Sequence, residues 1–140
     1  MHQRMIASML TLALVVMIPA MAQPQDAPAR MGVKQLGVGT GVGEDRNLVG
    51  ESDSFPVDTR VWFWTRVLGG GEEGDYVRHV WFHDGEEVLN FGGLRVGSPS
   101  WRTWTNKILG PGSEGEWRVE VRDPQDRVLA SKTFRCVSAP

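Results

Sequence analysis

Two histidines stand four residues apart in a stretch whose alternation predicts a β-strand, so His79 and His83 would point to one side of it. Two imidazoles on one face could form half of a zinc or copper site. A third ligand would have to be a nearby acid, and the candidates are Asp84, Glu86 and Glu116. No spacing selects any of them. The preferred interpretation is therefore that His79 packs in or beside the core and that His83 caps a hairpin.

Tryptophan is the second residue type that could carry a function, because the chain contains six. Strand parity puts Trp62 and Trp64 on the face opposite Val61. Trp101 and Trp104 are three residues apart, so they fall on opposite faces of another strand. Both faces of the predicted sheet therefore carry tryptophan, and only one of them can face a single core.

An exposed row of indoles beside arginines would suit sugar rings, which stack on aromatic faces. It would equally suit a partner protein, since Trp and Arg dominate interface hot spots. The alternative is that the aromatic rings pack between sheets, with guanidinium groups lying over them. The residues expected on a binding face are Trp62, Trp64, Arg102, Trp104 and Lys107.

Catalytic motifs do not stand out in this sequence. It contains no HExxH, GxSxG or GxxxxGK[ST] pattern. The glycines from Gly37 to Gly43 alternate and do not form GxGxxG, and the acidic stretch 44–58 lacks the spacing of a calcium loop. A small domain without long loops also offers little room for two carboxylates across a cleft. We expect no enzyme activity, no cofactor and no metal.

The N-terminal residues have the order of a secretory signal peptide. Arg4 precedes an apolar run from Met5 to Ile18, Pro19 ends that run, and Ala20-Met21-Ala22 forms a small-x-small cleavage site. About 14 apolar residues are short for a membrane span, which needs roughly 20. Residues 1–22 are therefore predicted to be a cleaved signal peptide, which places the protein in the periplasm or outside the cell; a retained N-terminal anchor is the alternative.

Charge and cysteine content narrow the classes of partner. Removal of Arg4 with the signal peptide would change the formal net charge from −2 to −3. An acidic chain argues against nucleic acid as a partner, because phosphate binding requires a basic surface.

The single cysteine, Cys136, cannot form an internal disulfide, and its strand parity with Phe134 indicates a buried side chain. An intermolecular bridge or a reactive thiol is the other interpretation.

Beyond the signal-peptide helix, residues 23–32 are predicted to be a flexible leader and 33–140 a single all-β domain. Short stretches of period-two alternation are separated by turn residues, and none is helical. This predicts about seven or eight strands in a small antiparallel β-sandwich of immunoglobulin-like size. The first strand, from Val33 to Val42, has a bare glycine face that another backbone or side chain could approach closely.

Glycine clusters mark the expected turns of this domain. Asp84-Gly85 predicts a type I′ hairpin. Residues 69–71 are all glycine and are expected at a hairpin tip, and Gly92-Gly93 is expected to end a strand.

Three stretches carry a family resemblance. His79 to Val88 resembles an H-x-W-x-x-D-G-x-x-V hairpin, Ser100 to Lys107 resembles W-R-T-W-S-S-K, and Gly115 to Phe134 resembles G-x-W-R-V-E-V followed by V-L-A-S and F. The positions that carry it are His79, Trp81, Asp84, Gly85, Trp101, Arg102, Trp104, Lys107 and Trp117. In this order they are similar to the bacterial DUF2914 family, a domain of unknown function. Residues 33–57 match less well, and Asp126-Arg127 stands where the pattern has Asp-Gly.

The resemblance implies a β-rich domain, often exported or attached to membrane segments, with no assigned reaction. Together with the tryptophan distribution, it favours a non-catalytic interaction domain that binds an envelope protein or an envelope glycan. The alternatives are a metal-binding or hydrolytic protein centred on His79 and His83, and a purely structural domain.

Overall fold

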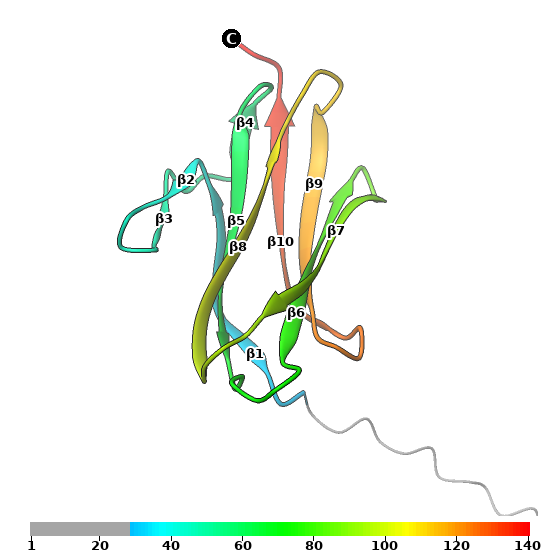
Figure 1. The fold of residues 1–140 in the computed structure, drawn as a ribbon. Helices are drawn as coiled ribbons and strands as arrows, with labels where there is room; N and C mark the ends of the chain where they lie inside the picture. Colours follow the sequence, from blue (N-terminus) through cyan, green and yellow to red (C-terminus); the bar gives the residue numbers. More distant parts are fainter. Residues whose placement is uncertain (1–28) are drawn as a thin grey trace, which may run out of the picture.

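The computed structural model describes residues 29–140, and within them two β-sheets pack face to face (Figure 1). The three-stranded sheet has the order β1-β5-β8, formed by β1 (Gly32–Gly39), β5 (Arg60–Leu68) and β8 (Ser100–Ile108). The five-stranded sheet has the order β4-β10-β9-β6-β7, formed by β4 (Ser54–Pro56), β10 (Val128–Val137), β9 (Gly115–Arg122), β6 (Tyr76–His83) and β7 (Glu86–Arg95). The predicted all-β sandwich is confirmed; the predicted signal peptide lies outside the described residues.

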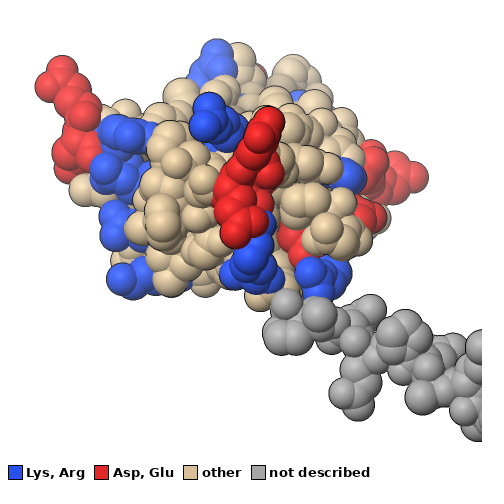
Figure 2. All heavy atoms as spheres, turned by 60° about the horizontal axis from the view of Figure 1, so that its bottom comes forward, with Lys and Arg blue, Asp and Glu red and all other residues tan. Residues whose placement is uncertain are grey.

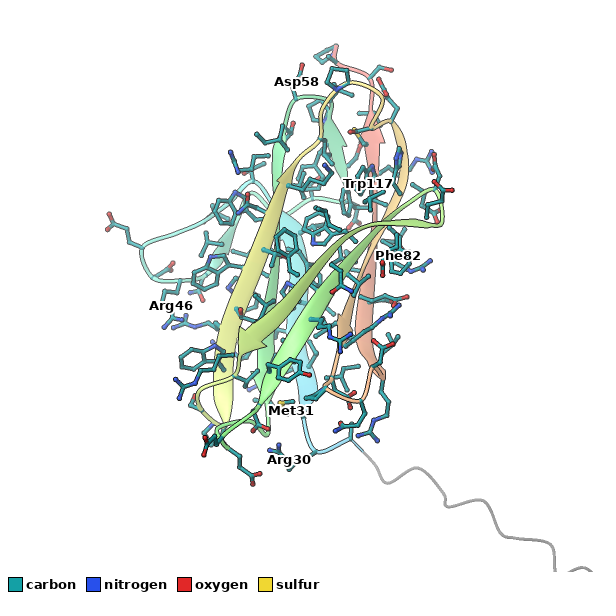
Figure 3. The ribbon with its side chains drawn as sticks, turned by 45° about the vertical axis from the view of Figure 1, so that its right-hand side comes forward. Arg30, Met31, Arg46, Asp58, Phe82 and Trp117 are labelled. Carbon is teal, nitrogen blue, oxygen red and sulfur yellow. The ribbon has the colours of Figure 1, made fainter. Side chains whose placement is uncertain are left out.

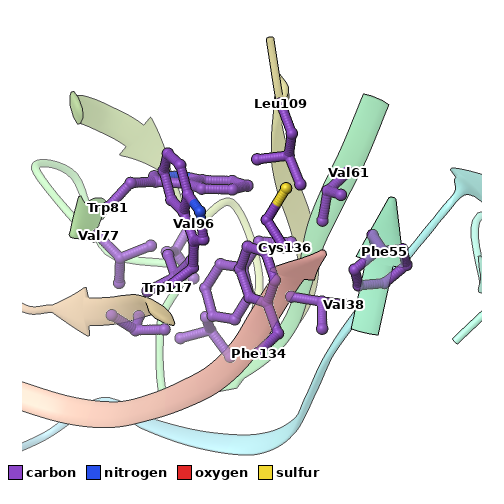
Figure 4. Close-up of a cluster of buried hydrophobic side chains, with 14 of the residues drawn as sticks. Val38, Phe55, Val61, Val77, Trp81, Val96, Leu109, Trp117, Phe134 and Cys136 are labelled. Atoms are coloured by element: carbon purple, nitrogen blue, oxygen red, sulfur yellow. The ribbon is translucent and has the colours of Figure 1, made fainter. Parts of the chain in front are cut away.

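The core fills the space between the two sheets, because alternate residues of each strand point inward. Val61, Phe63 and Val67 of β5 are fully buried, and they belong to one hydrophobic cluster with Trp81 of β6 and Trp117 of β9. Figure 4 shows Val61 and the two tryptophans in this cluster. Aromatic rings from both sheets pack edge to face or stacked against one another, which adds to the stabilisation from burial. The period-two pattern of the sequence is therefore the pattern of the core.

Cys136 also lies in this core, as its parity with Phe134 predicts. Its side chain is 2% exposed, and it packs near Val61 and Leu109 (Figure 4). Burial raises the pKa of the Cys136 thiol, and Glu114 adds to the shift. The thiolate needed for disulfide exchange is disfavoured here.

The β6–β7 hairpin has the predicted turn. Asp84 and Gly85 both have positive φ, 47° and 85°, as a type I′ turn requires. The Asp84 side chain also reaches across to β9, where its Oδ1 accepts the Glu116 N–H at 2.9 Å. This hairpin forms one edge of the five-stranded sheet.

Two turn predictions were wrong. Residues 69–71 do not form a hairpin tip, because they carry the chain from β5 in one sheet to β6 in the other. Gly70 is buried beside Val96 with no room for a Cβ atom, so these glycines serve close packing. Gly92-Gly93 does not end a strand either, since β7 continues to Arg95 with a register shift where the glycines lie.

Candidate functional site

A short hairpin lies on the glycine face of β1. It consists of β2 (Gly41–Val42) and β3 (Leu48–Val49), joined by residues 43–47. A Cβ atom on Gly37 would meet the Leu48 side chain, and one on Gly39 would meet Leu48 and the Val49 carbonyl oxygen. The bare face therefore does what the sequence predicts: it lets another piece of backbone approach closely.

The hairpin covers one of the tryptophans expected on a binding face. Trp64 Nε1 donates to the main-chain oxygen of Arg46 at 2.9 Å, and Trp64 is only 6% exposed. Trp62, two residues away on the same face, is half-buried. Trp64 is therefore not available to a ligand.

Arg102 of β8 ties the hairpin to the sheet. Its guanidinium donates to the Asp45 carbonyl at 2.9 Å and to Asn47 Oδ1 at 3.1 Å. A reciprocal hydrogen bond comes from the hairpin, because Arg46 Nη2 donates to the Arg102 carbonyl at 3.5 Å. Each arginine thus hydrogen-bonds to neutral oxygens of the segment that carries the other arginine.

The Arg46 side chain reaches over the outer strand β8. Its guanidinium carbon lies 5.4 Å from the ring centroid of Trp104 and 5.8 Å from that of Trp101, both within cation–π range (Figure 3). Arg46 also has φ +65°, a backbone conformation that glycine or asparagine adopts more easily. Strain of this kind often marks a residue kept for its side chain.

These residues line a recess on the open side of the sandwich, between the outer strands β7 and β8. The recess has a volume of about 360 Å³. Its lining is Arg46, Gly93, Leu94, Arg95, Trp101, Arg102, Thr103 and Trp104. We call it the arginine–tryptophan recess. Trp101 also packs against the core, so one wall is anchored in the interior.

The recess is basic in an otherwise acidic chain. Arg46, Arg95 and Arg102 form none of the ion pairs found among residues 29–140. By contrast, the arginines that lie elsewhere and pair with carboxylates are Arg30, Arg78, Arg118, Arg122 and Arg127. Figure 2 shows Lys and Arg side chains gathered along one flank of the end that carries the β5–β6 connection.

Arg66 adds a fourth guanidinium next to the recess. It pairs directly with Arg102 across β5 and β8, so the two side chains leave the same face of the sheet. Like charges placed opposite one another destabilise a sheet. The Arg66 Nε atom is also buried without a hydrogen-bond partner among the described residues. Neither guanidinium of this pair forms an ion pair with a carboxylate among residues 29–140.

The structure brings together some of the residues expected at a binding face and separates others. Arg102 and Trp104 line the recess, whereas Lys107 has the opposite strand parity and lies with its Nζ 6.0 Å from the Trp117 ring centroid. Arg46 and Arg95 were not anticipated, because they come from a turn and from the end of a strand.

His79 is enclosed between the sheets and is fully buried. Thr65 Oγ1 donates to the Thr103 carbonyl, so it accepts from His79 Nε2 at 3.3 Å. His79 Nδ1 then accepts from Thr105 Oγ1 at 2.9 Å, and Thr105 Oγ1 accepts from Trp81 Nε1 at 3.2 Å. The network is complete with a neutral imidazole, and burial lowers the His79 pKa to about 3.

His83 is far from His79 in this geometry. Four residues of strand separate them by about 13 Å, too far for one metal ion. His83 stacks on Trp117 with centroids 4.5 Å apart, and its Nε2 lies 2.9 Å from the Glu114 carbonyl. No group of three His, Cys, Asp or Glu residues within 29–140 could hold a metal ion. The geometry does not favour a metal ion shared by the two histidines, because both ring nitrogens of His79 are engaged by threonines.

The comparisons with known proteins address the family. Residues 74–136 match the family model whose description is protein of unknown function (DUF2914). The match runs from the start of β6 nearly to the end of β10, so it includes Trp101, Arg102 and Trp104 but not Arg46. No curated protein matches the chain. None of the residues from 29 to 140 forms a helix long and apolar enough to cross a membrane.

Proposed function

We propose that this chain, a member of the DUF2914 family through residues 74–136, is an exported, non-catalytic binding domain whose ligand site is the arginine–tryptophan recess. One observation carries the proposal. Three arginines that pair with no carboxylate within the described part of the chain, residues 29–140, stand beside two indoles at the open side of the sandwich. Export rests on the signal-peptide pattern of residues 1–22.

The composition of the recess supports binding. Its volume falls within the range of small-ligand sites, about 300–1,000 Å³. Trp and Arg are also the residues that contribute most at interfaces, because they bury large surfaces and still make directed polar contacts. The Arg46 side chain is already held over the two indoles and by the Arg102 carbonyl, so its guanidinium is in position before a ligand binds.

The same composition supports a non-catalytic role. The lining of the recess holds arginine, tryptophan, threonine, leucine and glycine, and it includes no carboxylate, imidazole or thiol. General acid–base catalysis needs such a group within reach of the reacting proton. Among residues 29–140, His79 is the one imidazole in the core, and its two nitrogens are already engaged.

Nuclear magnetic resonance of the six indole N–H groups tests the proposal. The protein as secreted would be titrated with a neutral glycan, an acidic glycan and an acidic peptide. Saturable shifts at Trp101 and Trp104, with Trp81 and Trp117 unchanged, would support the recess as the site. If none of the two glycans and the peptide shifts the Trp101 and Trp104 resonances, or if the Trp81 and Trp117 resonances shift equally, a purely structural domain becomes the better interpretation.

A further inference from the structure

We infer that the arginine–tryptophan recess takes a carboxylated glycan, with an acidic sugar beside Arg46 and Trp104 and a neutral sugar beside Tyr76. This inference rests on the proposed function and names its ligand class. It is carried by three features: the unpaired arginines, the indole surfaces, and a second hollow that continues the recess along β7.

The first feature is the charge. Arg46, Arg95 and Arg102 line the recess, and Arg66 stands opposite Arg102 in the neighbouring strand. None of the four pairs with a carboxylate among residues 29–140. A planar guanidinium binds a carboxylate through two parallel hydrogen bonds. A carboxylate near Arg66 and Arg102 would relieve their repulsion.

The second feature is the pair of indoles. Trp101 and Trp104 are half-buried, so each ring keeps exposed surface within the recess. Sugar rings stack on such surfaces while their hydroxyls take polar partners. Thr103, which also lines the recess, supplies a hydroxyl of its own.

The third feature is the length of the hollow. A second hollow of about 630 Å³ adjoins the recess, and both are lined by Gly93 and Arg95. Its other lining residues are Glu73, Gly74, Asp75 and Tyr76. Asp75 is buried and paired with Arg30, whereas the exposed Glu73 carboxylate can accept hydrogen bonds from sugar hydroxyls and would repel a second acid. A chain with an acidic sugar followed by a neutral one matches this change of charge.

An acidic peptide fits these features less well. A peptide would add as a strand to a free sheet edge. At β8 the Arg102 carbonyl already accepts from Arg46, and at β7 the register shift at Gly92-Gly93 interrupts the ladder. A single-stranded nucleic acid would stack on the indoles, but the exposed carboxylate of Glu73 would repel its next phosphate.

Isothermal titration calorimetry at low salt tests the inference. The probes are a hyaluronate octasaccharide, in which acidic and neutral sugars alternate, a neutral chitin oligosaccharide, poly-glutamate and oligo-thymidylate. We expect saturable binding of the hyaluronate and at least tenfold weaker binding of the other three. The Arg95→Ala variant should bind hyaluronate about tenfold more weakly, because one charge-assisted contact is lost.

Arg135→Ala is the matched control, since Arg135 is exposed on β10 and outside the recess. It should bind like the parent. Equal loss in both variants would mean that binding follows net charge alone, which overturns the inference. Preferred binding of poly-glutamate or oligo-thymidylate would overturn the glycan but leave the recess as a binding site. If none of the four probes binds, both the inference and the proposed function fail.

Discussion

Trp64 Nε1 lies 2.9 Å from the main-chain oxygen of Arg46, and this hydrogen bond fastens the β2–β3 hairpin to the sheet. The contact buries an indole that the sequence predicts on a binding face. It also places Arg46 so that its side chain lies over Trp104. A tryptophan thus acts here as a support for the site and not as part of its surface. The predictions that follow separate supporting residues from binding residues.

Trp64→Phe should lower the free energy of unfolding by at least about 1 kcal/mol, because a six-membered ring remains but the hydrogen bond to Arg46 and the buried pyrrole half of the indole are lost. Urea denaturation at neutral pH measures the change. Trp62→Phe is the control, since Trp62 is half-buried. If both variants lose the same stability, the hydrogen bond does not fasten the hairpin.

Gly39→Ala should destabilise the protein by about 1–3 kcal/mol, because the new methyl group would meet the Val49 carbonyl and displace the hairpin. Gly92→Ala is the matched control. A Cβ atom there meets nothing within 4 Å and φ is not positive, so its stability should change by less than about 0.5 kcal/mol. Thermal denaturation compares the two, and a neutral Gly39→Ala would contradict the close packing of hairpin on sheet.

Stability should depend on pH through His79. Its pKa is about 3 in the folded protein and about 6.5 in the unfolded chain, so the unfolded state binds the proton more readily. The stabilisation is complete above pH 6.5 and falls by about 1.4 kcal/mol per unit as pH drops toward 3. Urea midpoints at pH 7 and pH 4.5 measure it. His79→Gln should show a smaller difference between the two, and an equal difference would assign the pH dependence to other groups.

Cys136 should react slowly with a thiol reagent in the native protein and fast in urea. The side chain is 2% exposed, and burial raises the pKa of its thiol, so little reactive thiolate is present. Absorbance after addition of a disulfide reagent measures the rate. A rapid native reaction, or a disulfide-linked dimer on a non-reducing gel, would contradict this placement.

Much of this architecture follows from strand parity. The alternation from Val61 to Val67 predicts which side chains of β5 face the core, and Phe63 and Trp62 lie as expected. Asp84-Gly85 predicts its turn because only a few residue types accept two positive φ angles. Local rules of this kind need only neighbouring residues.

The binding surface could not be derived in the same way. Parity places Trp64 on the outer face of its sheet, but β2 and β3 are two residues long, too short for a periodic signal that would predict what covers it. Arg46 lies 56 residues from Arg102 along the chain, and only the folded structure shows that they meet. The same holds for Gly69 to Gly71, whose role depends on a neighbouring sheet.

The most direct test of the arginine–tryptophan recess is the dissociation constant of the hyaluronate octasaccharide for Arg46→Gly. Glycine relieves the strained backbone at φ +65°, so the free energy of unfolding of the variant should lie within about 1 kcal/mol of that of the parent. Asp126→Gly relieves the same strain, also at φ +65°, in the distant β9–β10 turn and should bind normally. We predict at least tenfold weaker binding for Arg46→Gly with its stability retained. Parental affinity in a folded Arg46→Gly protein would contradict the account.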